Sequence, residues 1–245
     1  MFAAILRDAA RQYRRRPLAL LVAFAVGVVE LALARLPHAG ALVAVTVPVG
    51  VAVLLADLLS DLFLVAYLAG GLEPAPPPAR AALAAMRRAA GPGIRGQLLK
   101  LAYAACALLV AGIMGVLVFG PPDPGASQVA YDTRLTVAFV PLGGFALAFL
   151  AVVLPRVVLG GERRALLAAA GSHRVARAYF PVCLALGLAE TVPFLDGLLH
   201  GVVADAVSLA LGTVLSPFVI AAANALYLRT RALQALTPER GGPPR

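Results

Sequence analysis

Long apolar runs, separated by shorter polar segments, dominate the pattern of hydrophobic and polar positions along this chain. The runs do not alternate between apolar and polar residues, so we do not expect the strands of a membrane barrel. About 20 apolar residues are enough to cross the hydrocarbon core of a bilayer as a helix. The pattern predicts an all-α, polytopic membrane helix bundle with six transmembrane helices, at about 18–36, 45–69, 98–119, 135–159, 179–199 and 206–228.

An arginine-rich segment precedes each pair of predicted helices, which divides a single membrane domain, residues 1–230, into three hairpins. The first two basic segments (2–16 and 79–90) place apolar residues on one helical face and arginines largely on the other, as interfacial helices do. The third (162–178) is poorly amphipathic, so we expect other parts of the protein to cover it. The hairpins and the short cytoplasmic tail run over about 1–70, 79–159, 162–230 and 231–245.

Composition supports a membrane protein and excludes several other classes. Of the 245 residues, 61% are hydrophobic and 13% are charged, and the mean hydropathy is +0.90. Soluble domains are nearer half apolar and a quarter charged, which excludes an ordinary cytosolic enzyme, a secreted disulfide scaffold and a disordered chain. Cys106 and Cys183 each lie in an apolar run, without the spacing of a disulfide framework or a metal site.

The net charge of +9 is distributed unevenly between the two sides of the predicted helices. Nineteen of the 21 Lys and Arg residues fall on one side, and only Arg35 and Arg134 fall on the other. This asymmetry predicts a multi-pass membrane protein with both termini in the cytoplasm. Because the arginines stand in short runs beside apolar stretches, we expect membrane lipids, and a membrane protein as a further option, rather than nucleic acid as partners.

An internal repeat is indicated by sliding the chain against itself. Residues 5–68 align with 165–228 without a gap and share fourteen identities in 64 positions, about twice what this composition gives by chance. The most distinctive match is a Gly-x-x-Glu sequence, at 27–30 and at 187–190. Because the aligned hairpins start on the same side of the membrane, the repeat is predicted to be parallel.

Four carboxylates interrupt the apolar runs, and an amide in the last helix could join them in a polar centre. A charge at the centre of a bilayer is unfavourable, so such groups face the bundle interior, a wet cavity or a partner. Two interpretations remain open: structural hydrogen bonds to neighbouring helices, or a relay for protons or cations. The candidate residues are Glu30, Asp57, Asp61, Glu190 and Asn224.

The two glutamates each follow a glycine by three residues, which places both side chains on nearly the same helix face. A glycine at that position allows a neighbouring helix to approach closely. We therefore expect Glu30 and Glu190 to point into the bundle.

Arginines next to the predicted membrane surface form a second candidate site. Clustered basic residues near an anionic leaflet attract it by about 1 kcal/mol each. An equally simple interpretation is that these arginines only set the topology. The candidates for an anionic-lipid belt are Arg14, Arg15, Arg16, Arg87 and Arg88.

Motifs for catalysis or cofactor binding are missing from the sequence. It has no His-Glu-x-x-His, no nucleophile elbow and no phosphate-binding Gly-Lys-Ser/Thr. His38 and His200 fall in predicted loops near Asp196, where solvated side chains are a simpler interpretation than a metal site. We therefore expect no metal, no cofactor and no enzymatic activity.

Two segments resemble a broad group of bacterial membrane proteins. Residues 5–17 (ILRDAARQYRRRP) and 152–174, which contain VVL, GGERRAL and SHR, are similar to the six-span membrane domain found with some glycerophosphodiester phosphodiesterases and to related multi-pass proteins. The chain has Arg16-Pro17 without the asparagine that is usual in the group, and it has none of the histidine and glutamate motifs of the phosphodiesterase domain. The resemblance implies a membrane module without that activity.

Two hypotheses for function follow. The leading one is a non-enzymatic membrane module that acts as a scaffold, an accessory or a lipid-associated protein. The alternative is a small transporter or channel that uses the intramembrane carboxylates to move protons or cations.

Overall fold

All regular secondary structure that the computed structural model describes is helical, as the sequence predicts. The structure describes residues 1–34, 43–120, 128–192 and 202–236. The predicted loop residues His38 and His200, and most of the predicted tail, lie outside these ranges.

Among the described residues, four stretches are long and apolar enough to cross a membrane. Many of their large apolar side chains face outward: Leu109 is 66% exposed and Leu117 is 74% exposed. Such surfaces suit contact with lipid and are too apolar for water. The stretches are α3 (Val43–Ala69), α4 (Ala79–Phe119), α5 (Gln128–Ala148) together with α6 (Val153–Val158), and α9 (Val202–Leu236).

Two further apolar helices are shorter. α2 (Leu18–Ala34) has 17 residues and α8 (Phe180–Thr191) has 12. At a rise of about 1.5 Å per residue, α8 reaches about 18 Å, which is less than the ~30 Å of a hydrocarbon core. The predicted spans at 18–36 and 179–199 extend past these helices into residues outside the described ranges.

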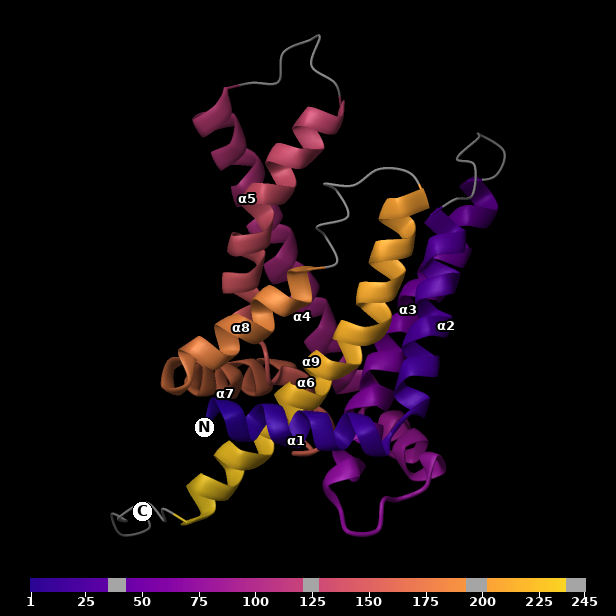
Figure 1. Ribbon diagram of the computed structural model, residues 1–245, viewed down its shortest axis with the longest axis vertical. Helices are drawn as coiled ribbons and strands as arrows, with labels where there is room; N and C mark the ends of the chain where they lie inside the picture. The colour runs from indigo at the N-terminus through magenta and orange to yellow at the C-terminus, as the bar shows by residue number, and fades with distance from the viewer. Residues whose placement is uncertain (35–42, 121–127, 193–201, 237–245) are drawn as a thin grey trace.

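Two helices lie across the others at one end of the molecule (Figure 1). α1 (Phe2–Arg15) and α7 (Ala165–Ala178) have 14 residues each, and they precede the helix pairs α2–α3 and α8–α9. α1 buries Ile5, Ala9 and Gln12 against the bundle, and α7 buries an alanine-rich face.

α4 is one helix of 41 residues, although we expected a basic segment at 79–90 and a separate span at 98–119. Pro92 lies inside it. A proline removes one backbone hydrogen bond, and contacts with neighbouring helices can still hold the helix together. Here Gly93 lies directly against Leu62 of α3, so the two helices are in close contact at this point.

The predicted fourth span (135–159) is not one continuous helix. α5 ends at Ala148, and a buried turn separates it from α6. Irregular backbone at this depth is stable only where its polar groups find partners inside the protein. The N–H of Val152 meets this requirement by donating a hydrogen bond of 3.2 Å to the buried hydroxyl of Ser172 in α7.

The core is densely packed around α1. Leu64 and Leu68 of α3 and Leu226 of α9 are fully buried there, together with Ile5 and Ala9 of α1. Farther from α1, the same long helices enclose a cavity.

Candidate functional site: a polar cavity between the helices

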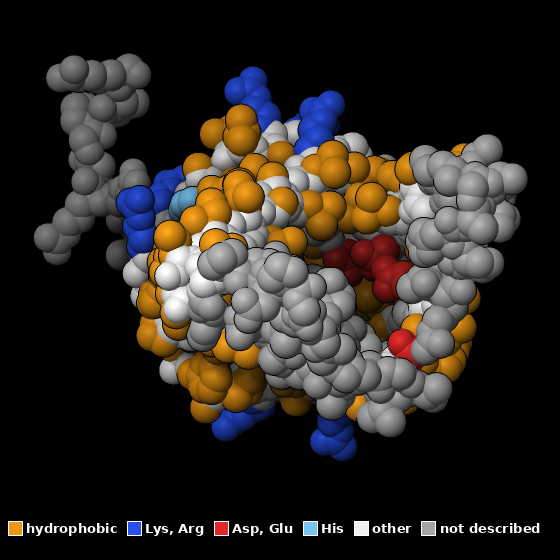
Figure 2. Space-filling model, turned by 90° about the horizontal axis from the view of Figure 1, so that it is seen from above, with side chains coloured by type: hydrophobic (Ala, Val, Ile, Leu, Met, Phe, Trp, Pro, Cys, Tyr) orange, Lys and Arg blue, Asp and Glu red, His pale blue; other side chains and the backbone are white. Residues whose placement is uncertain are grey.

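Seven of the described helices contribute to the lining of a cavity of about 590 Å³: mainly α2, α3, α4, α8 and α9, with one leucine each from α5 and α6. Its lining residues in α3 and α9 come from 54–64 and 205–220, whereas the turns that follow in both helices are buried in the core around α1. Figure 2 looks from the end opposite α1 and shows acidic side chains deep in a hollow. The cavity therefore opens away from α1 and is closed towards it.

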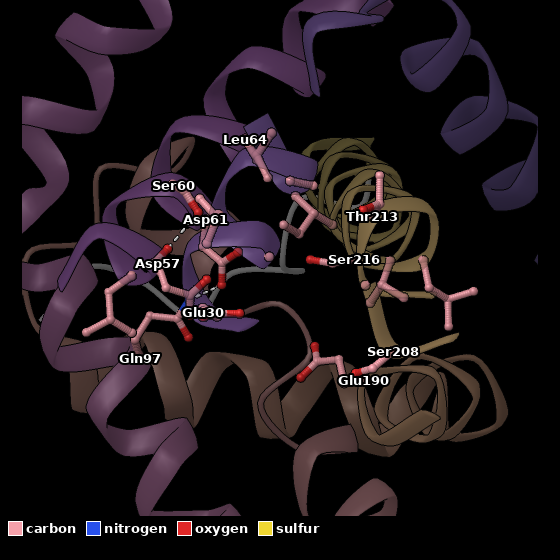
Figure 3. Close-up of a pocket in the computed structure, with 18 of the residues that line it drawn as sticks. Glu30, Asp57, Ser60, Asp61, Leu64, Gln97, Glu190, Ser208, Thr213 and Ser216 are labelled. Atoms are coloured by element: carbon pink, nitrogen blue, oxygen red, sulfur yellow. Dashed lines mark hydrogen bonds between the residues drawn. The ribbon is translucent and has the colours of Figure 1, made fainter. Parts of the chain in front are cut away.

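One wall of the cavity has carboxylates from two neighbouring helices. Asp57 and Asp61 are one turn apart on α3, and Glu30 of α2 lies near them (Figure 3). A Cβ atom on Gly27 would lie only 2.9 Å from Cδ1 of Leu209, so this glycine allows α2 and α9 to approach. Because Glu30 follows Gly27 by three residues, it lies on nearly the same face of α2, and this face lines the cavity.

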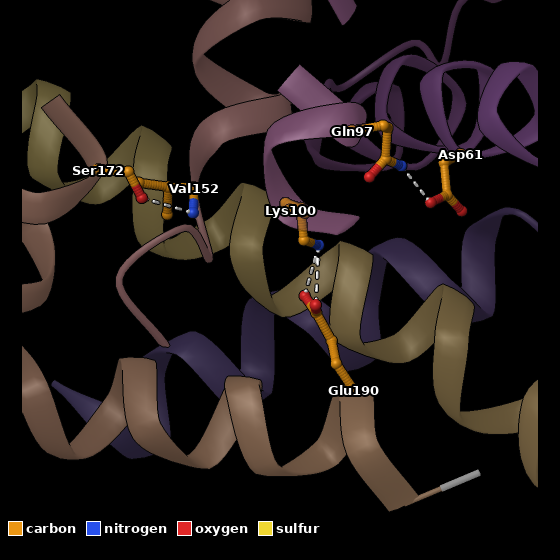
Figure 4. Close-up of polar contacts among 6 residues, drawn as sticks. All are labelled: Asp61, Gln97, Lys100, Val152, Ser172 and Glu190. Atoms are coloured by element: carbon orange, nitrogen blue, oxygen red, sulfur yellow. Dashed lines mark hydrogen bonds and ion pairs between the residues drawn. The ribbon is translucent and has the colours of Figure 1, made fainter. Parts of the chain in front are cut away.

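Asp61 has an amide partner on α4. Nε2 of Gln97 donates a hydrogen bond to Oδ2 of Asp61 (Figure 4), and Gln97 is buried. Glu30 and Asp57 differ from it, because their carboxylates accept no hydrogen bond and form no ion pair within the part of the chain that the structure describes.

The opposite wall contains an ion pair between α4 and α8. Nζ of Lys100 lies 2.9 Å from Oε1 and 2.8 Å from Oε2 of Glu190 (Figure 4). The two side chains are 15% and 20% exposed, so the pair is largely shielded from solvent. Lys100 is the only lysine of the chain and follows Gln97 by three residues, so one face of α4 presents an amide and an ammonium group to the cavity.

α9 adds hydroxyl groups and a fifth carboxylate, Asp205. No group of three His, Cys, Asp or Glu side chains is arranged to hold a metal ion in the described ranges. Among the described residues, five carboxylates and one ammonium group thus line the cavity, which suits it to bind positive charge. The hydroxyl residues are Ser60 of α3 and Ser208, Thr213 and Ser216 of α9, and the leucines of the lining include Leu31, Leu54, Leu58, Leu101, Leu209 and Leu215.

The structure brings four of the five candidates for the polar centre together and places the fifth elsewhere. Asn224 is fully buried near α1, where its Nδ2 donates to the carbonyl of Val65 (2.9 Å) and to Oε1 of Gln12 (3.4 Å). Gln12 in turn donates to the carbonyl of Ala221 at 3.0 Å. Asn224 therefore joins α1, α3 and α9 below the cavity and does not line it, contrary to our expectation.

Gln97 and Lys100 were not among the candidates, although both line the cavity. Their three-residue spacing at the start of a predicted span is a signal for a shared helix face. The charge of Lys100 was interpreted only as part of the topology.

The five candidate arginines have different environments. Arg14, Arg87 and Arg88 are exposed, and Arg15 is exposed while it donates to the carbonyl of Glu73 at 3.1 Å. Arg16, however, is only 6% exposed. Its Nη1 donates to the carbonyl of Pro77 at 2.8 Å, and its guanidinium lies 4.5 Å from the centre of the Tyr67 ring. The inclusion of Arg16 in a lipid-binding belt was therefore wrong, because neighbouring segments of the protein cover it.

No family model matches the chain, and comparison with curated proteins and with solved structures found no match either. What the chain does must therefore be inferred from the cavity, its charges and its position among apolar helices.

Proposed function

We propose that the chain is a non-enzymatic integral membrane protein that binds cations in the cavity and passes them across the membrane. The observation that supports this function is the excess of carboxylates over ammonium groups among the described residues that line one cavity between apolar helices. Ionisable groups at such depth are unfavourable unless they face water or a partner, and they commonly mark the path of an ion or a substrate. A cleft lined by one sign of charge also concentrates ions of the opposite sign.

The proposal includes a topology with six crossings: α2, α3, α4, α5 with α6, α8 and α9. Both termini are cytoplasmic in a bacterial plasma membrane, as the asymmetry of the arginines favours. α1 and α7 lie along the cytoplasmic surface, and the cavity opens to the outside. The parallel repeat is supported by the order of the helices, because α1–α2–α3 and α7–α8–α9 each consist of a helix that lies across the bundle followed by two apolar helices. Glu30 of α2 and Glu190 of α8, which are aligned in the repeat, both line the cavity.

Flux into vesicles tests the proposal. The purified protein is reconstituted into liposomes, and gradients of protons, Na⁺ and ethylammonium are applied in turn while a voltage-sensitive dye reports net entry of charge. We expect at least one of these cations to enter faster than into protein-free vesicles. Asp57→Asn should reduce this entry at least tenfold, because it removes an unpaired carboxylate from the cavity.

The matched control is Glu73→Gln, which neutralises an exposed carboxylate outside the cavity and should leave the flux unchanged. Size-exclusion chromatography and helical circular dichroism check that each variant is folded. If no cation enters above the protein-free rate, or if Asp57→Asn transports as well as wild type, the proposal is wrong.

The alternative function is a lipid-associated scaffold, in line with the resemblance to the six-span membrane domains. Exposed Arg14, Arg87 and Arg88 favour it, because such side chains are free to contact anionic headgroups. In this role the protein would retain anionic lipid and move no cations.

A further inference from the structure

We infer that the solute of the cavity is an organic ammonium compound, with its charged group between Glu30 and Asp57 and its apolar body along the leucines of the lining. This inference rests on the proposed function and adds the chemical class of the cation.

The first step is to separate the carboxylates that have a hydrogen-bond donor or a counter-ion from those that have neither. Asp61 has Gln97 as its hydrogen-bond donor, and Glu190 has Lys100 as its counter-ion. Glu30 and Asp57 have neither among the described residues, and both line the same part of the cavity (Figure 3). Two neighbouring negative charges are stabilised by a cation that binds between them.

The second step is the ammonium group that the cavity already holds. Both carboxylate oxygens of Glu190 contact Nζ of Lys100, at 2.9 and 2.8 Å. A primary ammonium group is thus accommodated in this cavity by direct contact with a carboxylate, where it donates charge-assisted hydrogen bonds. The direct ion pair of Lys100 is with Glu190 on α8, so Glu30 and Asp57 remain without an ion-pair partner among the described residues and can accept a second cationic group.

The third step concerns size and the uncharged part of the lining. A volume of about 590 Å³ lies within the range of pockets for small organic molecules, about 300–1,000 Å³. Leu54, Leu58 and Leu101 lie in the same lining as the carboxylates. Such side chains gain little from a hydrated inorganic ion, whereas they remove methylene groups of an organic cation from water.

A series of linear alkylammonium ions tests the inference. Binding of ethyl-, butyl- and hexylammonium to the full chain in nanodiscs is measured by calorimetry. Na⁺ serves as a probe without the apolar body, and butanol serves as a probe without the charge. We expect affinity to rise about fourfold per methylene group, with Na⁺ and butanol far weaker than butylammonium. Glu30→Gln and Asp57→Asn should each weaken butylammonium at least tenfold, and Glu73→Gln should not.

Three results would overturn the inference. If affinity does not depend on the length of the alkyl chain, or if Na⁺ binds as tightly as butylammonium, the solute is not an organic ammonium compound. The proposed cation function would still stand in that case. Unchanged butylammonium binding in the folded Glu30→Gln and Asp57→Asn variants would contradict the assigned site. The absence of both binding and flux for every cation would refute the proposed function as well.

Discussion

Lys100 supplies the one ammonium group among the described residues of the cavity lining, and its contact with Glu190 can be tested by a double-mutant cycle. Lys100→Met leaves Glu190 without a counter-ion near other carboxylates, and we expect the free energy of unfolding to fall by about 1–3 kcal/mol. Glu190→Leu alone should also destabilise. The double variant should recover most of the loss, because an apolar pair can replace a shielded ion pair.

Reversible unfolding in mixed micelles, followed by circular dichroism, measures the cycle. Strictly additive losses would mean that the two side chains do not stabilise each other in the folded protein.

His173 of α7 makes stability depend on pH. Its ring packs against Tyr103 and Phe149, and burial, followed by the nearby charge of Arg177, lowers its pKa from the ordinary value of 6.5. As the pH falls below 6.5, the unfolded chain takes up this proton before the folded protein does, so stability decreases. The loss is complete below the pKa of the folded state, and none of it is present well above pH 6.5.

Unfolding at a series of pH values, in wild type and in His173→Phe, measures this effect. The phenylalanine keeps the aromatic packing and cannot be protonated. An equally steep pH dependence in both proteins would assign the effect to other groups.

The candidate side chains differ in how far the sequence could predict them. Glu30 and Asp57 could be predicted because a carboxylate within an apolar run is recognised from the neighbouring sequence alone. The partners of the other two carboxylates are not, since Gln97 is 36 residues from Asp61 and Lys100 is 90 from Glu190. Such pairs depend on which helices become neighbours, and periodicity does not determine that.

At the scale of the helices, the crossing of α5 and α8 depends on glycine. A Cβ atom on Gly187 would overlap the carbonyl oxygen of Gly144 and lie 2.7 Å from the backbone nitrogen of Ala148. Gly187→Ala should therefore lower the free energy of unfolding by about 1–3 kcal/mol, because the helices must separate. Gly112→Ala in α4 is the matched control, since a Cβ there meets nothing within 4 Å.

The control should be neutral or should stabilise slightly, because alanine favours a helix over glycine. Thermal unfolding of both variants in the same detergent gives the comparison. Equal midpoints for the two would show that close packing at this crossing is unimportant.

Helix boundaries show the same division between local and distant causes. Apolar runs predict the helices well because each run is long and its composition is local information. The break between α5 and α6 was not predicted, since it depends on the hydroxyl of Ser172, 20 residues beyond Val152. The continuity of α4 through Pro92 was not predicted; next to this proline, Gly93 packs against Leu62 of α3, a contact that the local sequence does not show.

For the whole molecule, reporter fusions test the proposed topology. Fusions after residues 75, 165 and 240 should report the cytoplasm, and those after 38, 125 and 201 should report the outside, as the positive-inside rule predicts. Alkaline phosphatase and a fluorescent protein give opposite signals at each site. A cytoplasmic signal at 125 would exclude six crossings.

The exposed arginines at the end with α1 should bind anionic lipid. The triple variant Arg14→Gln, Arg87→Gln, Arg88→Gln should carry less anionic lipid through purification, and its stability should change by less than about 0.5 kcal/mol. Mass spectrometry of the bound lipid measures the change. Arg16→Gln serves as the contrasting control, because it removes a buried contact and should destabilise the fold.

Unchanged lipid content in a correctly inserted triple variant would mean that these arginines act on topology alone. The experiment thus separates the scaffold role from cation transport, which the flux assay measures independently.

The closed end of the cavity is joined by contacts between the two ends of the sequence. Asn224 and Gln12 are 212 positions apart, and Arg229 and Asp8, which form an ion pair, are 221 apart. Because synthesis proceeds from the N-terminus, α1 can pack against Leu64 and Leu68 of α3 early, whereas its contacts with α9 form only after almost the entire chain has been made. A chain that ends before residue 221 therefore lacks the residues of α9 that bind Gln12 and Asp8, and the closed end of its cavity is held by α1 and α3 without α9.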